Sequence, residues 1–239
     1  MKSLKMIIGV LCASMLFSSC NMTNGAKGGM IGGAAGGAAG AGIGAGIGAL
    51  VNGKKGAKLG AAIGAGVGVA AGATAGTLIG KKMDRAKAAA AAIAQAETFT
   101  DANGLEGVKV TFDNGILFNV GKSDLKSAAQ ASLKKFADNV LNVYTDCDVN
   151  IYGFASSDGS DATNLTLSEA RAKSVANYLT GSCKVANKQI RTTKGFGENP
   201  DYLIYNADGK ENQQASRRVE VYLYASEEMI KAANEGTLK

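Results

Sequence analysis

Glycine recurs at every fourth position through two long stretches in the first third of the chain. One series runs from Gly28 to Gly48 and the other from Gly56 to Gly80, separated by a short charged turn. This spacing places the glycines on one face of a helix, where the missing side chains let a second helix backbone approach closely. Each series is long enough to cross a hydrocarbon layer of roughly 30 Å. The pattern predicts a glycine-zipper helical hairpin over residues 28–82.

The hairpin has one alternative, a flexible glycine-rich tether. Each glycine costs about 1 kcal/mol relative to alanine inside a helix, so the segment is a poor candidate for an isolated helix in water. Lys58 lies inside the second series and favours the tether. If the hairpin forms in a membrane, its glycine face also offers a contact for a homo-oligomer.

The start of the chain has the layout of a secretory signal peptide. Lys2 and Lys5 provide a positive beginning, and the apolar run from Met6 to Phe17 is too short to span a bilayer as a stable helix. We therefore expect residues 1–19 to be removed during export.

The residues around Cys20 resemble a bacterial lipobox. Two serines precede the cysteine, although Phe17 stands where an aliphatic side chain is usual. The resemblance implies that the thiol is acylated and that residues 20–27 form the lipidated N-terminus. Several acyl chains on one residue anchor a protein stably, so outer membrane lipid is an expected partner. A chance cysteine near the cleavage site is the alternative.

Cysteine usage is consistent with an oxidising compartment. Cys12 leaves with the signal peptide and Cys20 is consumed by acylation, which leaves the pair Cys147 and Cys183. An even number of cysteines in an exported chain favours a disulfide. The alternative is two small buried side chains without a bond.

Several function classes are disfavoured by what the sequence lacks. It has no histidine, the commonest general base and metal ligand, so neither an enzyme nor a bound metal or cofactor is expected. The formal charge of +6 comes without an arginine-rich arm, so nucleic acid is not an expected partner. A P-loop-like run over Gly48–Lys54 continues with Lys55 rather than Ser or Thr, and Ser132–Lys135 has a β-lactamase-like spacing without companion motifs. We treat both runs as coincidences.

From residue 105 onward the chain has the patterns of an ordinary mixed domain. An alanine-rich stretch over residues 83–104 precedes it and is expected to be a helical spacer. Periodicity predicts the order β-α-β-α-β-β, hence an α+β domain over residues 105–226 with a mixed sheet and its helices packed on one face. Residues 227–239 would form a C-terminal helix or tail. The expected strands cover 108–112, 116–118, 149–154, 190–196 and 218–224, and the expected helices begin at a Ser123 cap and at a capping box from Thr166 to Glu169.

One run of residues is specific enough to indicate a family. The pattern Asn-x-x-Leu-Ser-x-x-Arg-Ala-x-x-Val is matched by Asn164, Leu167, Ser168, Arg171, Ala172 and Val175. Weaker blocks at residues 115–125, 195–198 and 216–220 occur in the matching order. The stretch from Ile116 to Ala225 therefore resembles the outer membrane protein A-like C-terminal domain, and the glycine-zipper lipoprotein front end resembles one subgroup of that family. The resemblance implies a peptidoglycan-binding domain in the periplasm.

Arg171 has a position that is hard to explain by stability alone. It lies four residues after Leu167 and four before Val175, which places it on the packing face of its helix. It is also expected close to the helix N-terminus, where the dipole disfavours a cation. A fixed guanidinium beside a polar loop is suited to gripping a carboxylate with two hydrogen bonds. The alternative is an internal ion pair with Glu169, Asp158 or Glu220.

The resemblance also implies roles for the residues around Arg171. In the family, this arginine binds the diaminopimelate carboxylate of the wall peptide, and an aspartate on the preceding loop binds the ammonium group. Ser156 stands at that aspartate position, so ligand affinity should fall by about 1 to 3 kcal/mol unless Asp158 or Asp161 turns inward. A second departure is Ser216, which replaces an asparagine. The expected peptidoglycan-binding residues are Arg171, Asn164, Asp158, Ser156 and Arg217.

The leading hypothesis from the sequence is a non-catalytic tether. Acylated Cys20 and the glycine zipper hold the outer membrane, and the C-terminal domain holds diaminopimelate-type peptidoglycan from the periplasm. A second hypothesis keeps the same fold without wall binding, as a structural, interaction or oligomerisation module of the envelope. Binding to purified sacculi separates the two hypotheses.

Overall fold

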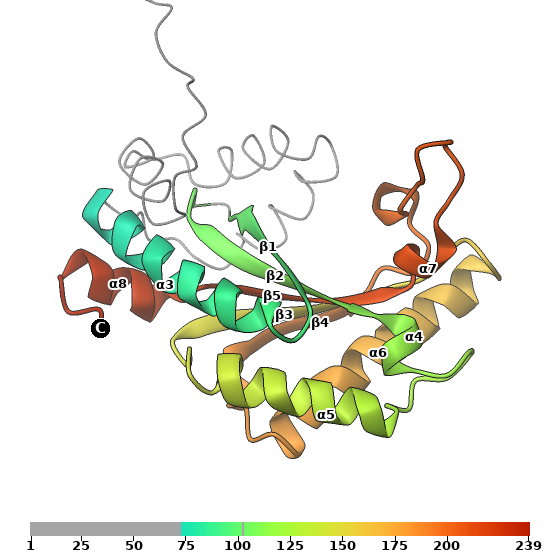
Figure 1. The fold of residues 1–239 in the computed structure, drawn as a ribbon, viewed down its shortest axis with the longest axis horizontal. Coiled ribbons are helices and arrows are strands. Elements are labelled where there is room, and N and C mark those ends of the chain that lie inside the picture. The colour runs from blue at the N-terminus through green and yellow to red at the C-terminus, as the bar shows by residue number, and fades with distance from the viewer. Residues whose placement is uncertain (1–72, 102) are drawn as a thin grey trace, which may run out of the picture.

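A computed structural model describes residues 73–101 and 103–239 of the chain (Figure 1). The predicted signal peptide, Cys20 and most of both glycine series lie outside the described residues. The helices are α3 (Ala73–Ala91), α4 (Asn114–Leu117), α5 (Ser127–Phe136, continued by a π-helical turn over Ala137–Leu141), α6 (Asp161–Gly181), α7 (Gln213–Ser216) and α8 (Glu227–Asn234). The strands are β1 (Gln95–Thr100), β2 (Glu106–Asp113), β3 (Cys147–Phe154), β4 (Ile190–Gly195) and β5 (Arg218–Ala225).

The strands form one mixed sheet in the order β1-β2-β5-β3-β4. The central strand β5 pairs antiparallel with β2 on one side and with β3 on the other, while β3 and β4 run parallel. A parallel pair needs a long crossover connection, which α6 provides. The predicted α+β class is confirmed, and so is the predicted order β-α-β-α-β-β, here β2-α5-β3-α6-β4-β5.

All four long helices cover the same face of the sheet, as predicted (Figure 1). Val110, Val221 and Ile151 are neighbours across three adjacent strands and are fully buried in one core cluster with residues of the helices. Aliphatic residues alternate with polar or aromatic ones along β5, because the two faces of the strand have different neighbours.

Two glycines allow α6 to lie very close to the sheet. A Cβ atom on Gly153 of β3 would lie 2.1 Å from the main-chain oxygen of Ser168, and one on Gly195 of β4 would lie 2.3 Å from the main-chain nitrogen of Glu169. Any side chain at either position would push the helix away. These close approaches therefore fix the distance between the sheet and the middle of α6, which carries Arg171.

Two predicted features between β2 and α5 are wrong. The expected strand over 116–118 is replaced by the single turn α4, because Asp113 Oδ1 accepts a hydrogen bond from Gly115 N over 2.6 Å and caps a helical turn there. The expected cap at Ser123 is absent as well. Phe118 and Leu125 form an isolated β-bridge that keeps this segment extended, so α5 begins only at Ser127.

The start of α6 also differs from the prediction. The helix begins at Asp161, and Ser160 is its N-cap, with Oγ accepting from Thr163 N over 3.4 Å. Thr166, the predicted cap, lies inside the helix, where its Oγ1 donates to Ala162 O over 2.9 Å. The capping-box pattern was misleading because a threonine within a helix satisfies its hydroxyl on the preceding turn.

Residues 73–100, which were expected to end the glycine hairpin and to form a spacer, pack as α3 and β1 onto the rest of the described domain. The predicted boundary at residue 82 falls inside α3, whose Ile79 and Met83 are fully buried in the core cluster. Strand β1 was not predicted, and it pairs with β2 along its whole length. Lys82 Nζ forms an ion pair with Asp146 Oδ2 at 2.6 Å, which fastens α3 to the loop before β3.

Cys147 and Cys183 are both buried free cysteines, so the predicted disulfide is not formed. Cys147 lies near Lys82 and Asp146, whereas Cys183 lies near Lys134 and other groups at the end of α6. The thiols thus face different surroundings, and burial raises the pKa of both. The alternative of two small buried side chains is the one realised.

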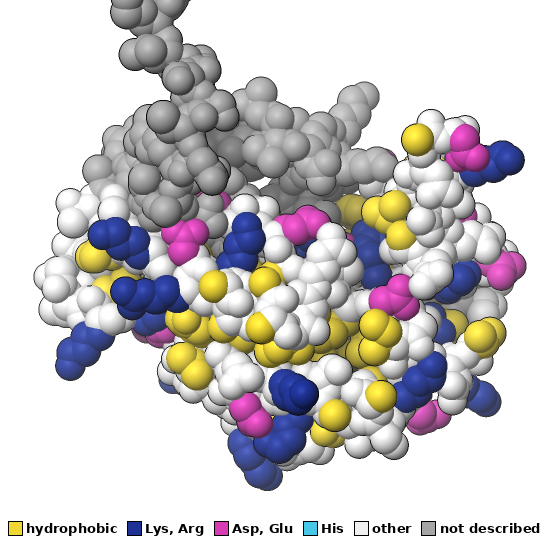
Figure 2. All heavy atoms as spheres, viewed as in Figure 1, with side chains coloured by type: hydrophobic (Ala, Val, Ile, Leu, Met, Phe, Trp, Pro, Cys, Tyr) yellow, Lys and Arg dark blue, Asp and Glu magenta, His cyan; other side chains and the backbone are white. Residues whose placement is uncertain are grey.

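The surface in Figure 2 carries mixed charges. Lysine and arginine side chains of the described residues are interspersed with acidic ones on this face rather than gathered into one stripe (Figure 2). Within residues 73–101 and 103–239, no helix combines the length and the apolar character that crossing a membrane requires.

Candidate ligand-binding site

Arg171 is a buried cation that lacks a carboxylate partner within the described chain. Its side chain lies in the third turn of α6, away from the helix N-terminus, so the predicted unfavourable dipole contact does not exist. The residue is only 3% exposed. Its Nε donates to the main-chain oxygen of Lys122 over 3.0 Å, and its Cζ lies 5.4 Å from the centre of the Phe118 ring.

The internal ion pairs considered from the sequence are not formed. Glu169 pairs with Lys173 at 2.8 Å, and Glu220 pairs with Arg218 at 2.7 Å. Burial, followed by the nearby charge of Arg217, lowers the pKa of Arg171 to about 10. The guanidinium remains charged at neutral pH, so the site holds a positive charge that the described residues leave unpaired.

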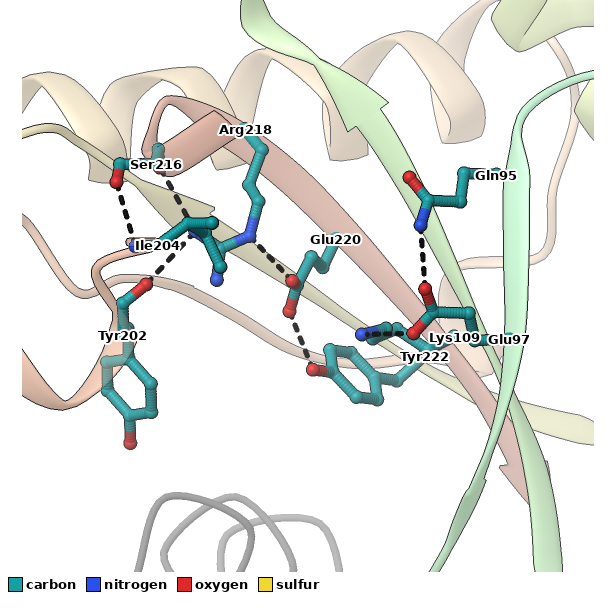
Figure 3. A network of polar contacts seen from close by, with 9 residues as sticks. All are labelled: Gln95, Glu97, Lys109, Tyr202, Ile204, Ser216, Arg218, Glu220 and Tyr222. Carbon is teal, nitrogen blue, oxygen red and sulfur yellow. Dashed lines mark hydrogen bonds and ion pairs between the residues drawn. The ribbon is translucent and has the colours of Figure 1, made fainter. Parts of the chain in front are cut away.

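Arg218 shows how the same fold treats an arginine that has a structural role. Its Nε donates to Glu220 Oε1 over 2.7 Å, and its Nη1 donates to the main-chain oxygens of Tyr202 and Ser216 over 3.1 Å each (Figure 3). The other carboxylate oxygen of Glu220 accepts from the Tyr222 hydroxyl over 2.6 Å. Arg218 is therefore buried with its charge compensated, in contrast to Arg171.

Asn164 holds the loop between β3 and α6 in shape. Its Nδ2 donates to the main-chain oxygens of Ser156 and Asp158 over 3.1 and 3.0 Å, and also to Glu198 Oε2. The amide donors are thus used within the protein. These contacts show that Asn164 positions the loop, and its predicted role in ligand binding stays a prediction.

Ser156 and Arg217 contact each other directly. Ser156 is 2% exposed, and its Oγ accepts a hydrogen bond from Arg217 Nη1 over 3.1 Å. Because Arg217 also lies near enough to Arg171 to influence its pKa, the structure brings these three predicted site residues together. Asp158 differs from them, since its side chain is exposed at the loop tip and contacts no described residue through its carboxylate.

Two carboxylates at the site were missed by the sequence analysis. Glu211 accepts from Ser157 N over 3.2 Å at Oε1 and 3.3 Å at Oε2, and also from Ser157 Oγ. Glu198 contacts Asn164 and lies beside Asp161, and a hydrogen bond between the two carboxyl groups raises the pKa of Glu198. Both glutamates come from the long connection between β4 and β5. Glu198 ends the weak family block at 195–198, which was not read as a site, and no motif or periodicity marks Glu211.

Comparison with known proteins identifies relatives of the C-terminal part of the chain. Residues 117–227 match the model of the OmpA family. Outer membrane protein A from Escherichia coli O157:H7 is 30% identical over 128 residues, which cover 50% of this chain and 36% of that protein. Outer membrane protein P5 from Haemophilus influenzae is 32% identical over 134 residues, which cover 55% of this chain and 36% of that protein.

The fold is also similar to solved structures. The cell wall anchor of the T6SS from Pseudomonas aeruginosa is 21% identical with a TM-score of 0.46, over 60% of this chain and 97% of that one. The chain spans little more than a third of the length of the two outer membrane proteins. The matched segment contains Arg171 with its loop and the strands β3, β4 and β5. Residues 117–227 therefore form an OmpA-like domain.

Proposed function

We propose that the chain is a non-enzymatic envelope lipoprotein whose OmpA-like domain binds diaminopimelate-type peptidoglycan. The observation that carries this proposal is Arg171, a buried cation with one hydrogen bond and no carboxylate partner among the described residues. Leaving a charge buried and unpaired is costly. A ligand carboxylate would offset that cost, so the site is prepared for an anion.

The expected ligand group is the carboxylate of the diaminopimelate residue in a wall peptide. A guanidinium can hold a carboxylate with two parallel hydrogen bonds, and Nε of Arg171 is the only nitrogen of its fork with a partner among the described residues. Arg217 adds a second positive charge nearby. The OmpA-family membership of residues 117–227 supports a wall ligand over another carboxylate.

The arrangement of the ends of the domain supports a tether. In Figure 1, α3 begins beside α8 at one end of the domain, whereas α4, α7 and the start of α6 lie at the other end. Acylated Cys20 and the glycine zipper predicted over residues 28–82 would join the domain through α3, which shares residues 73–82 with the zipper. The binding site would then lie away from the outer membrane, with the domain in the periplasm and the zipper available for a homo-oligomer.

Sedimentation with purified sacculi tests the proposal. The full chain in detergent should pellet with the sacculi, and Arg171→Ala should weaken binding by about 1.5 to 3 kcal/mol, roughly tenfold or more. Arg171→Lys should restore binding only in part, because a lysine lacks the planar fork. Lys173→Ala is a matched control that removes an exposed charge from the same helix and should leave binding unchanged.

The opposite result has a definite meaning. Wild-type protein that stays in the supernatant would show that this OmpA-like domain does not bind the wall and would favour the interaction-module hypothesis. The anchor is tested separately by Cys20→Ser, which should abolish labelling with a fatty-acid probe. Labelling that persists in that variant would exclude Cys20 as the acylation site.

A further inference from the structure

We propose that Glu211 supplies the negative charge that binds an ammonium group beside the carboxylate held by Arg171. The site would then recognise the zwitterionic end of an amino acid, rather than a carboxylate alone. This inference rests on the proposed function, because it assigns a second residue to the same ligand.

The contacts of Glu211 place its carboxylate at the loop that borders the site. Both of its oxygens accept from Ser157 N, and Ser157 Oγ donates to one of them. A hydrogen bond from Ser216 also reaches the carboxylate, while Ser216 Oγ itself accepts from Ile204 N over 2.9 Å. Glu211 is therefore fixed directly beside Ser156, the position where the loop itself lacks a charge.

A small hairpin in the β4–β5 connection holds Glu211 in place. Tyr205 and Glu211 form an isolated antiparallel bridge, and Asn206 N donates to Lys210 O over 2.8 Å. The turn between them closes through Gly209, whose N donates to Asn206 O over 3.0 Å and whose φ is +78°. A carboxylate held in this way is positioned by main-chain contacts and does not depend on a flexible loop.

The charges around Glu211 suit a zwitterion. Partial burial pulls the pKa of Glu211 upward, but hydrogen bonds from Ser157 and Ser216 and the charge of Arg217 outweigh it, so the pKa lies below its usual value. Arg217 is also close enough to Arg171 to lower its pKa, and it donates to Ser156, next to the Ser157 that Glu211 holds. The site thus combines a fixed carboxylate with a guanidinium that no described carboxylate pairs, and the α-carbon of an amino acid carries both an ammonium and a carboxylate group.

Other carboxylates near the site fit this role less well. Asp158 is exposed at the loop tip and is not held by any described hydrogen bond to its carboxylate. Glu198 accepts from Asn164 and faces the carboxyl group of Asp161, so its oxygens are engaged within the loop and its pKa is raised by that hydrogen bond. Glu211 combines ionisation, fixed geometry and proximity to Arg217.

The test compares two ligands that differ only in their amino groups, meso-diaminopimelate and pimelate. Titration calorimetry on the full chain should show wild type binding diaminopimelate about tenfold or more tighter than pimelate, as expected for one charge-assisted contact. Glu211→Gln should remove most of this difference and leave pimelate binding within about twofold of wild type. Ser156→Asp in the Glu211→Gln background should restore the preference, because the new carboxylate lies beside the same position.

Asp158→Asn is the matched control, since it removes one negative charge from the same end of the domain and should keep the preference. Equal loss of both ligands in Glu211→Gln would show that Glu211 only holds the loop, and would overturn the inference. Equal affinity of wild type for the two ligands would also overturn it while leaving carboxylate binding by Arg171 intact. Wild type that binds neither ligand would instead contradict the proposed function itself.

Discussion

Arg217 Nη1 donates a hydrogen bond to Ser156 Oγ over 3.1 Å, and this contact joins the residue just before β5 to the loop that follows β3. The serine hydroxyl carries no charge, so it orients the guanidinium without neutralising it. Arg217 and Arg171 therefore give this part of the site a positive charge. The pKa of Arg171 is lowered by burial and, to a smaller extent, by the nearby charge of Arg217. Four measurements follow from this arrangement and from the packing that supports it.

Arg218→Ala should destabilise the domain far more than Arg171→Ala. Removing Arg218 leaves Glu220 buried without its partner and should lower the free energy of unfolding by about 3 to 5 kcal/mol. Removing Arg171 relieves an unpaired buried charge and should change stability by less than about 1 kcal/mol. Urea unfolding of both variants measures the difference. A large loss of stability in Arg171→Ala would mean that Arg171 has a structural role.

Gly195→Ala should destabilise the domain and weaken ligand binding together. The added Cβ would overlap the backbone of Glu169, and overpacking of this kind costs about 1 to 3 kcal/mol. The helix would have to move away from β4 and would carry Arg171 with it. Gly181→Ala is the control, because a Cβ at the end of α6 meets no atom within 4 Å. Thermal unfolding and sacculus binding on both variants should separate them, and equal behaviour would contradict the tight contact.

Asp101→Asn should remove a pH dependence of stability. Burial raises the pKa of Asp101 to about 6 from 3.8, although hydrogen bonds from Leu105 N and Asn103 N oppose the shift. A raised pKa means that the folded state binds the proton more tightly, so this contribution is complete below pH 3.8 and is lost as the pH rises through 6. Relative to Asp101→Asn, wild type should lose up to about 3 kcal/mol between pH 4 and pH 7 in urea unfolding. Parallel curves for the two proteins would contradict the raised pKa.

Met83→Ala should destabilise the OmpA-like domain although it lies outside the matched segment. Met83 lies on α3 and its side chain is fully buried in the core cluster. Truncating such a side chain lowers the free energy of unfolding by about 2 to 5 kcal/mol. Lys81→Ala, an exposed neighbour on the same helix, should have little effect. A single cooperative transition at a lower midpoint is the expected result. An unchanged midpoint for Met83→Ala would mean that α3 is a spacer, as the sequence had suggested.

The sequence by itself determined the central architecture and the position of Arg171 on the buried face of its helix. Hydrophobic periodicity over short windows predicted β2, α5, β3, α6, β4 and β5 in order, because each of these elements has one buried face that is visible locally. The run from Asn164 to Val175 marked the helix that carries the site. Element boundaries were less accurate, since the contacts that set them, such as the Phe118 to Leu125 bridge, are made between side-by-side segments rather than within a helix.

Only the tertiary structure decided how the site is assembled. Glu211 contacts Ser157 across 54 residues of sequence, and Arg217 contacts Ser156 across 61, and no local pattern encodes such pairings. The same holds for α3 and β1, whose alanine-rich and polar sequences resemble a spacer. Packing against α8 and the sheet buries one face of α3, and pairing with β2 partly buries β1. Burial and charge pairing depend on which distant segments meet. Only the folded domain therefore shows that Asn164 holds the loop and that no carboxylate of the described residues pairs with Arg171.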